Sequence, residues 1–431
     1  MIQIKRNFNI LASLLLIESL FAQMSERVRY PHNIAHRGSS GYIPEHSLQA
    51  YQTAMDLQSD YIEPDLCLTK DGILVAIHDI LLDDVTDVAE KYSGRNRTQD
   101  VYGIITSGYF VSDFNLNEIK TLKLHQRLPY RSTIYDNLFT IPTLDEIMNL
   151  LQKEYETNKI TIGLYVEIKY PSFHNSLGFN MKMEDKLLQS LYTAGYKING
   201  TGVYRNAKNV VPVIIQCFEA ASLVYLRPKT QVPLVQLVEI NSSSTELSPT
   251  GMINALSKEL VIKISKYANG IGPDKEFFTF MTTADGRSLV DLAHSLELVI
   301  HPWTFRADGG ILAWQDINNS FYKEQSFFFE CLNIDGLFGE FPDMTKQVID
   351  NLLSGEYVYP ECHAASTSNE ACDYSEGLVI GLIVGIVILS VLSIGLLGYI
   401  YMHFYTLHEP QSSSTESKSL PLAHLEAKSS K

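Results

Sequence analysis

The stretch YIEPDLCLTKDGILVAIHD, residues 61–79, sets the fold of this chain. It contains two runs of β-branched and apolar residues, 61–69 and 73–78, and only the three residues 70–72 separate them. A crossover between parallel strands needs a dozen or more residues, so these two runs must form an antiparallel hairpin. The first run is therefore a strand that extends beyond its sheet, turns and returns along itself.

Segments on both sides of this hairpin also have the composition of buried strands. There are seven of them, at 33–37, 163–168, 211–217, 233–239, 270–272, 298–302 and 335–338. Patterns typical of helices alternate with the strands, at 47–57, 143–154, 182–194 and 284–296. This alternation predicts a parallel sheet. With the returning strand of the hairpin set aside, eight parallel strands remain, which is the number in a (β/α)8 TIM-type barrel.

The predicted barrel is distorted and larger than usual. The region 23–360 is 338 residues long, against roughly 250 for a plain barrel of this type. Residues 80–140 show no alternation of strands and helices, so we expect a small insertion there, after the hairpin. The sequence thus predicts one large α/β domain, and it contains no internal repeat.

Both ends of the chain carry an apolar block. Lys5 and Arg6 precede an apolar run at 10–21, so residues 1–22 match a secretory signal peptide. Residues 378–402 contain no charge over 25 positions, enough for a transmembrane helix that crosses the roughly 30 Å hydrocarbon core. We therefore expect a chain that enters the secretory route and stays anchored in its membrane.

The flanks of the predicted span set its orientation. The stalk before it, 361–377, has no Lys or Arg, whereas the polar tail after it, 403–431, has three lysines. This asymmetry predicts a cytoplasmic tail and a single-pass type I protein whose domain is extracellular or lumenal. Four N-glycosylation acceptors lie in the external region and agree with it, at Asn96, Asn199, Asn241 and Asn318.

The five cysteines form no dense disulfide framework. Cys362 and Cys372 lie in the stalk, where a bond between them would close a small loop. Cys67 and Cys217 lie in apolar, strand-like runs, so we expect them to be buried thiols of the core.

The charge of the chain excludes one class of partner. Lys and Arg total 34 against 49 for Asp and Glu, a net charge of −15, which argues against binding nucleic acid. The signal segment carries +1 and the tail 0, so 23–376 carries −16. An acidic domain that acts on an anionic substrate needs a local positive group, such as a metal ion or a well-placed arginine.

Polar residues follow or end the predicted strands, at the face where the active sites of such barrels lie. Glu63 and Asp65 are two positions apart, and therefore on one face of their strand. Glu167 ends another strand, and His36 and His78 end two more. Carboxylates this close repel one another unless a cation separates them or one of them takes up a proton. Oxygen ligands favour Ca²⁺ or Mg²⁺, although the neighbouring histidines keep Zn²⁺ open.

The order of motifs along the chain resembles a known family. The run IAHRGSSGYIPEHSLQAYQTA at 34–54 joins the hairpin stretch, and further blocks follow it in order: VEIKYPSFH, IIQCFEA, YANGIGPD, VIHPWTFRAD and DGLFGEFPD. Together they resemble the signature of glycerophosphodiester phosphodiesterases from about residue 33 to 345, and look closest to the bacterial periplasmic branch. Ser47 and Glu340 depart from the commoner residues of this signature.

The resemblance implies a role for each of these polar side chains. It implies that Glu63, Asp65 and Glu167 bind the divalent metal, and that His36 and His78 are the acid/base pair. It also implies that two cations neutralise the phosphate oxygens, namely Arg37 and Lys169.

Other residues near the predicted mouth have two interpretations each. Trp303 either forms a wall for the alcohol headgroup or packs a helix on the barrel, and Tyr42 is a similar candidate wall. Glu45 either acts in the site, by orienting Arg37 or by binding substrate, or supports the structure of its loop. Gln216 and His301 point either to the mouth or into the core.

The resemblance implies metal-dependent hydrolysis of glycerophosphodiesters to sn-glycerol 3-phosphate and an alcohol such as choline or ethanolamine. The nucleophile is either water or a neighbouring hydroxyl of the glycerol, which would give a cyclic phosphate. Two alternatives remain: hydrolysis of lysophospholipids in the manner of a phospholipase D, and an inactive barrel that serves as a surface receptor or adhesion module.

Overall fold

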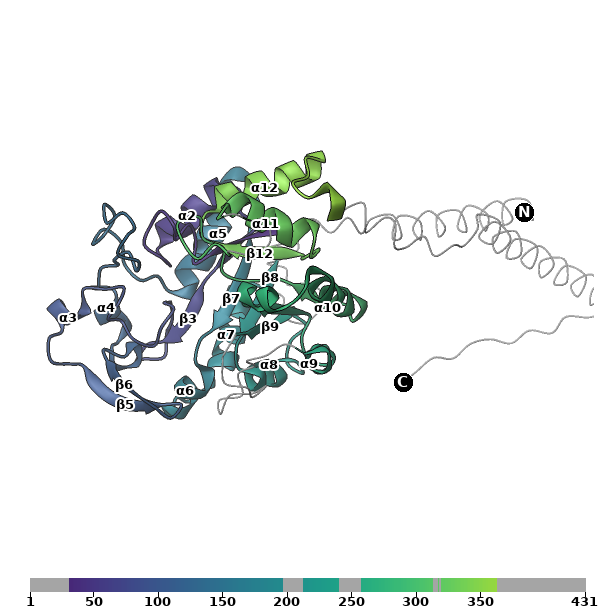
Figure 1. The fold of residues 1–431 in the computed structure, drawn as a ribbon. Coiled ribbons are helices and arrows are strands. Elements are labelled where there is room, and N and C mark those ends of the chain that lie inside the picture. Colours follow the sequence, from purple (N-terminus) through teal and green to yellow (C-terminus); the bar gives the residue numbers. More distant parts are fainter. Residues whose placement is uncertain (1–30, 197–211, 240–256, 313–316, 318, 363–431) are drawn as a thin grey trace, which may run out of the picture. The chain divides into compact units, whose positions relative to one another are not determined.

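The computed structural model describes residues 31–196, 212–239, 257–312, 317 and 319–362 (Figure 1). Within these residues the parallel strands follow the order β11-β10-β9-β8-β7-β2-β1-β12. Their bounds are β1 His32–His36, β2 Tyr61–Glu63, β7 Gly163–Ile168, β8 Val213–Cys217, β9 Leu234–Val238, β10 Gly270–Pro273, β11 Val299–Ile300 and β12 Gly336–Gly339.

Backbone hydrogen bonds join the two outermost strands of this order. The amide of Asp335 donates to Ile300 at 3.0 Å, and the amide of Phe338 donates to Pro302 at 3.0 Å. These bonds bring β12 beside β11, so the eight parallel strands close into a TIM-type barrel. The predicted fold class is confirmed for the barrel.

The hairpin of the opening stretch is present. β3, Asp65–Leu68, continues β2 after a break at Pro64, and it pairs with β7 in parallel. It then pairs antiparallel with β4, Leu74–Ala76, with Cys67 opposite Val75. Proline has no N–H to donate, which accounts for the break in the ladder.

The four predicted helices are α2 Leu48–Asp56, α5 Leu144–Asn158, α7 Met183–Thr193 and α10 Thr283–Ser295. The side chain of Ser47 caps α2, and Thr143 with Glu146 forms a capping box for α5. Among the described residues, five further helices follow barrel strands and were not predicted: α6 Pro171–Ser176, α8 Ala220–Leu226, α9 Lys258–Ile264, α11 Phe321–Glu330 and α12 Pro342–Ser354.

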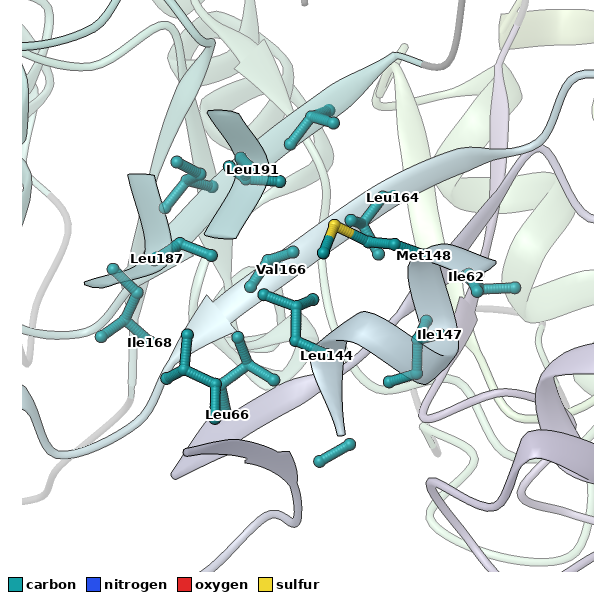
Figure 2. Close-up of a cluster of buried hydrophobic side chains, with 14 of the residues drawn as sticks. Ile62, Leu66, Leu144, Ile147, Met148, Leu164, Val166, Ile168, Leu187 and Leu191 are labelled. Atoms are coloured by element: carbon teal, nitrogen blue, oxygen red, sulfur yellow. The ribbon is translucent and has the colours of Figure 1, made fainter. Parts of the chain in front are cut away.

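The alternation of side chains along β7 separates the core from the barrel interior. Leu164 and Val166 point outward and pack against α5 and α7 in the apolar cluster of Figure 2. Tyr165, which lies between Leu164 and Val166 in the sequence, belongs to a second cluster with Ile34 and Phe338 of other strands. A strand has a side-chain period of two, so Tyr165 and Glu167 share the inner face. The barrel interior is therefore apolar below and charged at its mouth.

The region between β4 and α5 forms a small subdomain with its own apolar cluster, which includes Leu82, Phe110 and Phe114. Its elements are α3 Val88–Lys91, an antiparallel hairpin of β5 Arg97–Val101 and β6 Ile104–Gly108, and α4 Leu116–Ile119. The hairpin and the short helices were not predicted. This cluster also contains Cys67 and Val75, so the subdomain packs on the β3–β4 hairpin.

The cysteine pairing corrects the sequence analysis. Cys362 bonds to Cys331, at the end of α11, rather than to Cys372, because the chain after α12 returns to α11. Tyr359 packs on Phe327 of the same helix and fixes this return. Cys67 and Cys217 are free and buried, as predicted.

We expect loss of this disulfide to lower the free energy of unfolding by about 3 to 4 kcal/mol, because it closes a loop of 31 residues. Urea unfolding of Cys362→Ser measures the loss, and Cys372→Ala is the matched control that leaves stability unchanged. Equal destabilisation by the two variants would contradict the Cys331–Cys362 pairing.

Among the residues that the structure describes, no helix has the length and apolarity needed to cross a membrane. The predicted signal peptide 1–22, span 378–402 and tail 403–431 lie outside the described residues. So do three of the four glycosylation acceptors, whereas Asn96 is described and exposed.

Candidate active site

Three predicted metal ligands meet at the mouth of the barrel. Glu63 ends β2, Asp65 begins β3 and Glu167 lies in β7, directly beside Asp65 in the strand register. One oxygen from each carboxylate lies within 4.8 Å of the other two, and all three side chains are buried. Asp65 Oδ1 receives no hydrogen bond from any described residue. An oxygen set with an unused buried acceptor fits a hard divalent cation.

The electrostatics of these carboxylates also fit a cation. Burial, with the charges of Asp65 and Glu167, raises the pKa of Glu63 well above its usual value. Burial likewise raises the pKa of Glu167, although Lys169 opposes it. Burial alone would raise the pKa of Asp65, but Lys169 and the hydrogen bond with His46 lower it well below the usual range. Negative charge at Glu63 and Glu167 is therefore costly until a cation shares the site.

Two cationic side chains lie beside the carboxylates, as predicted. Lys169 Nζ is 2.9 Å from Glu167 Oε1, and the burial of both side chains is nearly complete. Arg37 Nη1 donates to Glu45 at 3.0 Å, while the Arg37 amide donates to Glu63 Oε2 at 2.9 Å. Glu45 therefore orients Arg37, which is one of the roles that the sequence analysis considered for it.

The two histidines flank the carboxylates and cations, and the Nδ1 of each histidine is hydrogen-bonded to a further carboxylate. His36 Nδ1 donates to Glu340 at 3.1 Å, and His78 Nδ1 donates to Asp79 at 2.8 Å. Burial and the charge of Arg37 lower the pKa of His36 to about 4. Burial and the charges of Arg37 and Lys169 lower the pKa of His78 to about 3. Each carboxylate fixes a tautomer in which Nε2 is the nitrogen that can accept or give a proton.

Two arginines of the subdomain hold these carboxylates in place. Arg127 donates to Asp79 at 2.8 Å and binds Glu45 through two bonds of 2.7 and 2.9 Å. Arg131 donates to Glu340, which also accepts from Arg306 at 2.9 Å. The subdomain thus positions both histidines and Arg37 through the carboxylates that connect them to Arg127 and Arg131.

We expect Arg127→Gln to lower kcat roughly 10- to 100-fold with a smaller change in KM, because it loosens His78 and Arg37 without touching substrate. Arg127→Lys should recover little, since a lysine cannot make the bidentate contact with Glu45. Steady-state kinetics test this prediction. The control is Arg287→Gln, because Arg287 forms an ion pair with Asp291 on the surface of α10. An unchanged kcat in Arg127→Gln would contradict the positioning role.

A cavity of about 720 Å³, including its open mouth, lies over the carboxylates; we call it the catalytic pocket. His36, His78, Arg37, Lys169 and two of the carboxylates line it, and so does Trp303. The Trp303 indole donates to Gly272 at 2.8 Å and leaves its ring as part of the wall. Trp303 therefore lies at the rim of the pocket, which is the position expected for a wall residue.

The remaining candidates divide between mouth and core. Gln216 donates to Glu63 at 2.9 Å and lies in the mouth. His301 is buried beside Tyr165, at 3.0 Å from its hydroxyl, and lies in the interior below the site. Tyr42 packs on Phe341 and is not part of the pocket.

Sequence reasoning missed several residues around the site. His46 bridges Tyr51 and Asp65 with contacts of 2.8 and 3.0 Å. Arg127 and Arg131 come from the subdomain, which lacks a periodic pattern that could have placed them. The one available signal was their position in the insertion that follows the hairpin.

Comparisons with known proteins show the family to which the chain belongs. The family model described as the glycerophosphoryl diester phosphodiesterase family matches residues 36–344. Glycerophosphodiester phosphodiesterase GDPD6 of Arabidopsis thaliana is 36% identical over 72% of this chain and 84% of its own length. A glycerophosphodiester phosphodiesterase of Haemophilus influenzae is 29% identical over 72% of this chain and 87% of its own length.

The fold is also that of a solved relative. The crystal structure of a putative glycerophosphoryl diester phosphodiesterase from Silicibacter pomeroyi superposes with a TM-score of 0.53 at 17% identity, over 76% of this chain and 95% of that one. The family match includes every carboxylate and histidine of the barrel mouth. This chain is accordingly an enzyme that belongs to the glycerophosphoryl diester phosphodiesterase family.

Proposed function

We propose that the barrel hydrolyses glycerophosphodiesters, in a metal-dependent reaction, to sn-glycerol 3-phosphate and an alcohol. The observation that carries this proposal is the group of three buried carboxylates, flanked by two histidines and two cations in one pocket. A phosphodiester is an anion that gains charge as it is attacked, and this arrangement supplies groups that offset that charge.

Glu63, Asp65 and Glu167 would hold the cation, either Ca²⁺ or Mg²⁺. When bound, it supplies positive charge beside the phosphoryl oxygens. Arg37 and Lys169 point into the same pocket and would bind the other phosphate oxygens. Their own partners, Glu45 and Glu167, keep them in place before the substrate arrives.

His36 and His78 would carry the protons. One takes a proton from the nucleophile, and the other gives one to the leaving alkoxide. Burial and the neighbouring cations hold the pKa of each imidazole low, at about 4 for His36 and about 3 for His78. A phosphate anion beside an imidazole favours its charged form and raises this pKa toward the working range. The nucleophile is water or a glycerol hydroxyl, and trapping of a cyclic phosphate during turnover would identify the second.

We also propose that this is a single-pass membrane enzyme. The boundaries that support it come from the sequence: signal peptide 1–22, barrel 23–360, stalk 361–377, span 378–402 and cytoplasmic tail 403–431. The catalytic domain would lie in the extracellular space or a lumen, with Asn96 available for glycosylation, and its motifs look closest to the bacterial periplasmic branch. Protease protection of the tail in sealed vesicles tests the orientation.

The test of activity uses a purified protein that consists of residues 23–376. With glycerophosphocholine and Ca²⁺ or Mg²⁺, we expect release of glycerol 3-phosphate and choline, and a chelator should stop it. Lysophosphatidylcholine, run in parallel, shows whether the lysophospholipid is the better substrate. If no phosphodiester is cleaved and no metal is bound, the barrel is not the enzyme that we propose.

A further inference from the structure

A second cavity opens beside the catalytic pocket, and no step of the proposed reaction uses it. The residues found in both cavities are His78, Glu167, Lys169, Phe218 and Trp303. His36, Arg37 and Glu63 line the catalytic pocket alone. The second cavity is therefore continuous with the site on the His78 side. A group that projects from the phosphate in this direction would enter it.

Aromatic rings form the walls of this second cavity. Tyr102 and Tyr170 stack with ring centres 6.0 Å apart at an interplanar angle of 24°. Phe218 and Trp303 meet edge to face at 5.6 Å. These pairs come from different parts of the chain: Tyr102 lies in the turn of the β5–β6 hairpin, and the others follow barrel strands. Ring faces of this kind attract cations.

The same cavity contains a buried carboxylate without a cation. Glu219 is 3% exposed, and it accepts a hydrogen bond of 2.6 Å from the Tyr102 hydroxyl and others from Ser172. It forms no ion pair with any described residue, and burial raises its pKa. Glu239, directly after β9, adds an exposed carboxylate to the lining of the cavity. A carboxylate in a low-dielectric site is stabilised when a cation enters.

One cation does border the cavity, and its charge is already compensated. Lys169 Nζ lies 5.4 Å from the centre of the Phe218 ring and 2.9 Å from Glu167 Oε1. It occupies the boundary with the catalytic pocket, where the phosphate would bind. The far part of the cavity, between Tyr102, Tyr170 and Glu219, is thus free of positive charge among the described residues.

We propose that this second cavity binds a quaternary ammonium group, so that the enzyme prefers glycerophosphodiesters whose alcohol carries such a cation. The inference rests on the proposed function and adds a substrate class to it. A polyol headgroup would need several hydrogen-bonding groups, but Tyr102 and Glu219 already bind each other. A trimethylated ammonium donates no hydrogen bond and is held by ring faces and a nearby anion.

The experiment compares two substrates that differ only in charge. One is glycerophosphocholine, and the other is its 3,3-dimethylbutyl analogue, in which carbon replaces the ammonium nitrogen. For purified 23–376 we expect kcat/KM to favour the choline ester at least roughly 10-fold, given the strength of desolvated cation–π contacts. Glu219→Gln and Tyr102→Leu should each reduce this ratio about 3- to 10-fold, and leave kcat/KM for the neutral analogue nearly unchanged.

Tyr192→Leu, an exposed tyrosine of α7, is the control and should keep the wild-type ratio. Tyr102 lies in a surface turn, so its loss tests the cavity even if Glu219→Gln fails to fold. Hydrolysis of both esters at equal rates by wild type, or an unaltered ratio in both variants, would overturn the cavity assignment. Hydrolysis of neither ester would instead overturn the proposed function, so the two failures are distinguishable.

Discussion

Glu63→Gln is expected to lower kcat/KM by about 10³-fold or more. The change replaces one of three carboxylates, whose oxygens lie within 4.8 Å of one another, with an amide, a much weaker ligand for a hard cation. Without the cation, the charge that builds on the phosphoryl oxygens loses several kcal/mol of stabilisation. The amide keeps the size of the side chain, so the barrel should still fold.

The same variant should be at least as stable as the metal-free wild type. Burial and the charges of Asp65 and Glu167 disfavour a charged Glu63 without metal, and a neutral amide at this position avoids that cost while it can still contact Arg37 and Gln216. We therefore expect an inactive protein whose Tm without metal is equal to or above that of wild type. Ca²⁺ or Mg²⁺ should raise the Tm of wild type and leave that of the variant unchanged.

Thermal denaturation with and without metal, run beside kinetics, checks both halves of this prediction. Glu154→Gln is the matched control, because Glu154 is a buried glutamate of α5 outside the mouth. It should keep full activity and the full metal-induced shift. A Glu63→Gln enzyme with wild-type kcat/KM would show that this carboxylate does not hold the metal.

His78→Ala is expected to lower kcat about 10²- to 10⁴-fold on glycerophosphocholine, the usual range for loss of a general acid or base. His78 borders both cavities, whereas His36 borders only the catalytic pocket. If the alcohol occupies the second cavity, as we propose, it leaves next to His78. We therefore expect His78 to give the proton to the leaving oxygen and His36 to receive one from the nucleophile.

A p-nitrophenyl ester of glycerol phosphate separates these roles, because its leaving group departs as a stable anion and needs no proton. His78→Ala should recover most of its lost rate on this ester, and His36→Ala should not. The control is His294→Ala, because His294 of α10 pairs with Asp335 outside the mouth. Equal recovery in the two variants would contradict the division of roles.

The barrel and its charged mouth were predictable because both follow from local rules. Only three residues separate the runs 61–69 and 73–78, which predicted the β3–β4 hairpin, and counting the other strands then gave the closed sheet. The period of two along a strand is enough to place Glu63 and Asp65 on one face. Strands of a parallel barrel end at one rim, which brings Glu167 to the same point.

The subdomain and its arginines were not predictable in this way. Arg127 and Arg131 lie in an irregular segment, where neither period nor spacing indicates the direction of a side chain. Their partners, Asp79 and Glu340, are 48 and 209 positions away along the chain. The same limit led to the wrong disulfide, since Cys331 meets Cys362 only after α12 returns the chain to α11.

The fold class, the family resemblance and the group of carboxylates and histidines at the strand ends all follow from the amino-acid sequence alone. They depend on short-range sequence patterns: the alternation of hydrophobic residues along each strand, and the polar residues at the strand ends. Three other features emerge only in the folded domain: the arginines that hold the histidines, the pairing of Cys331, and the contact of Tyr102 with Glu219 in a second cavity. Those contacts join segments far apart in the chain, and packing of the whole domain is what brings them together.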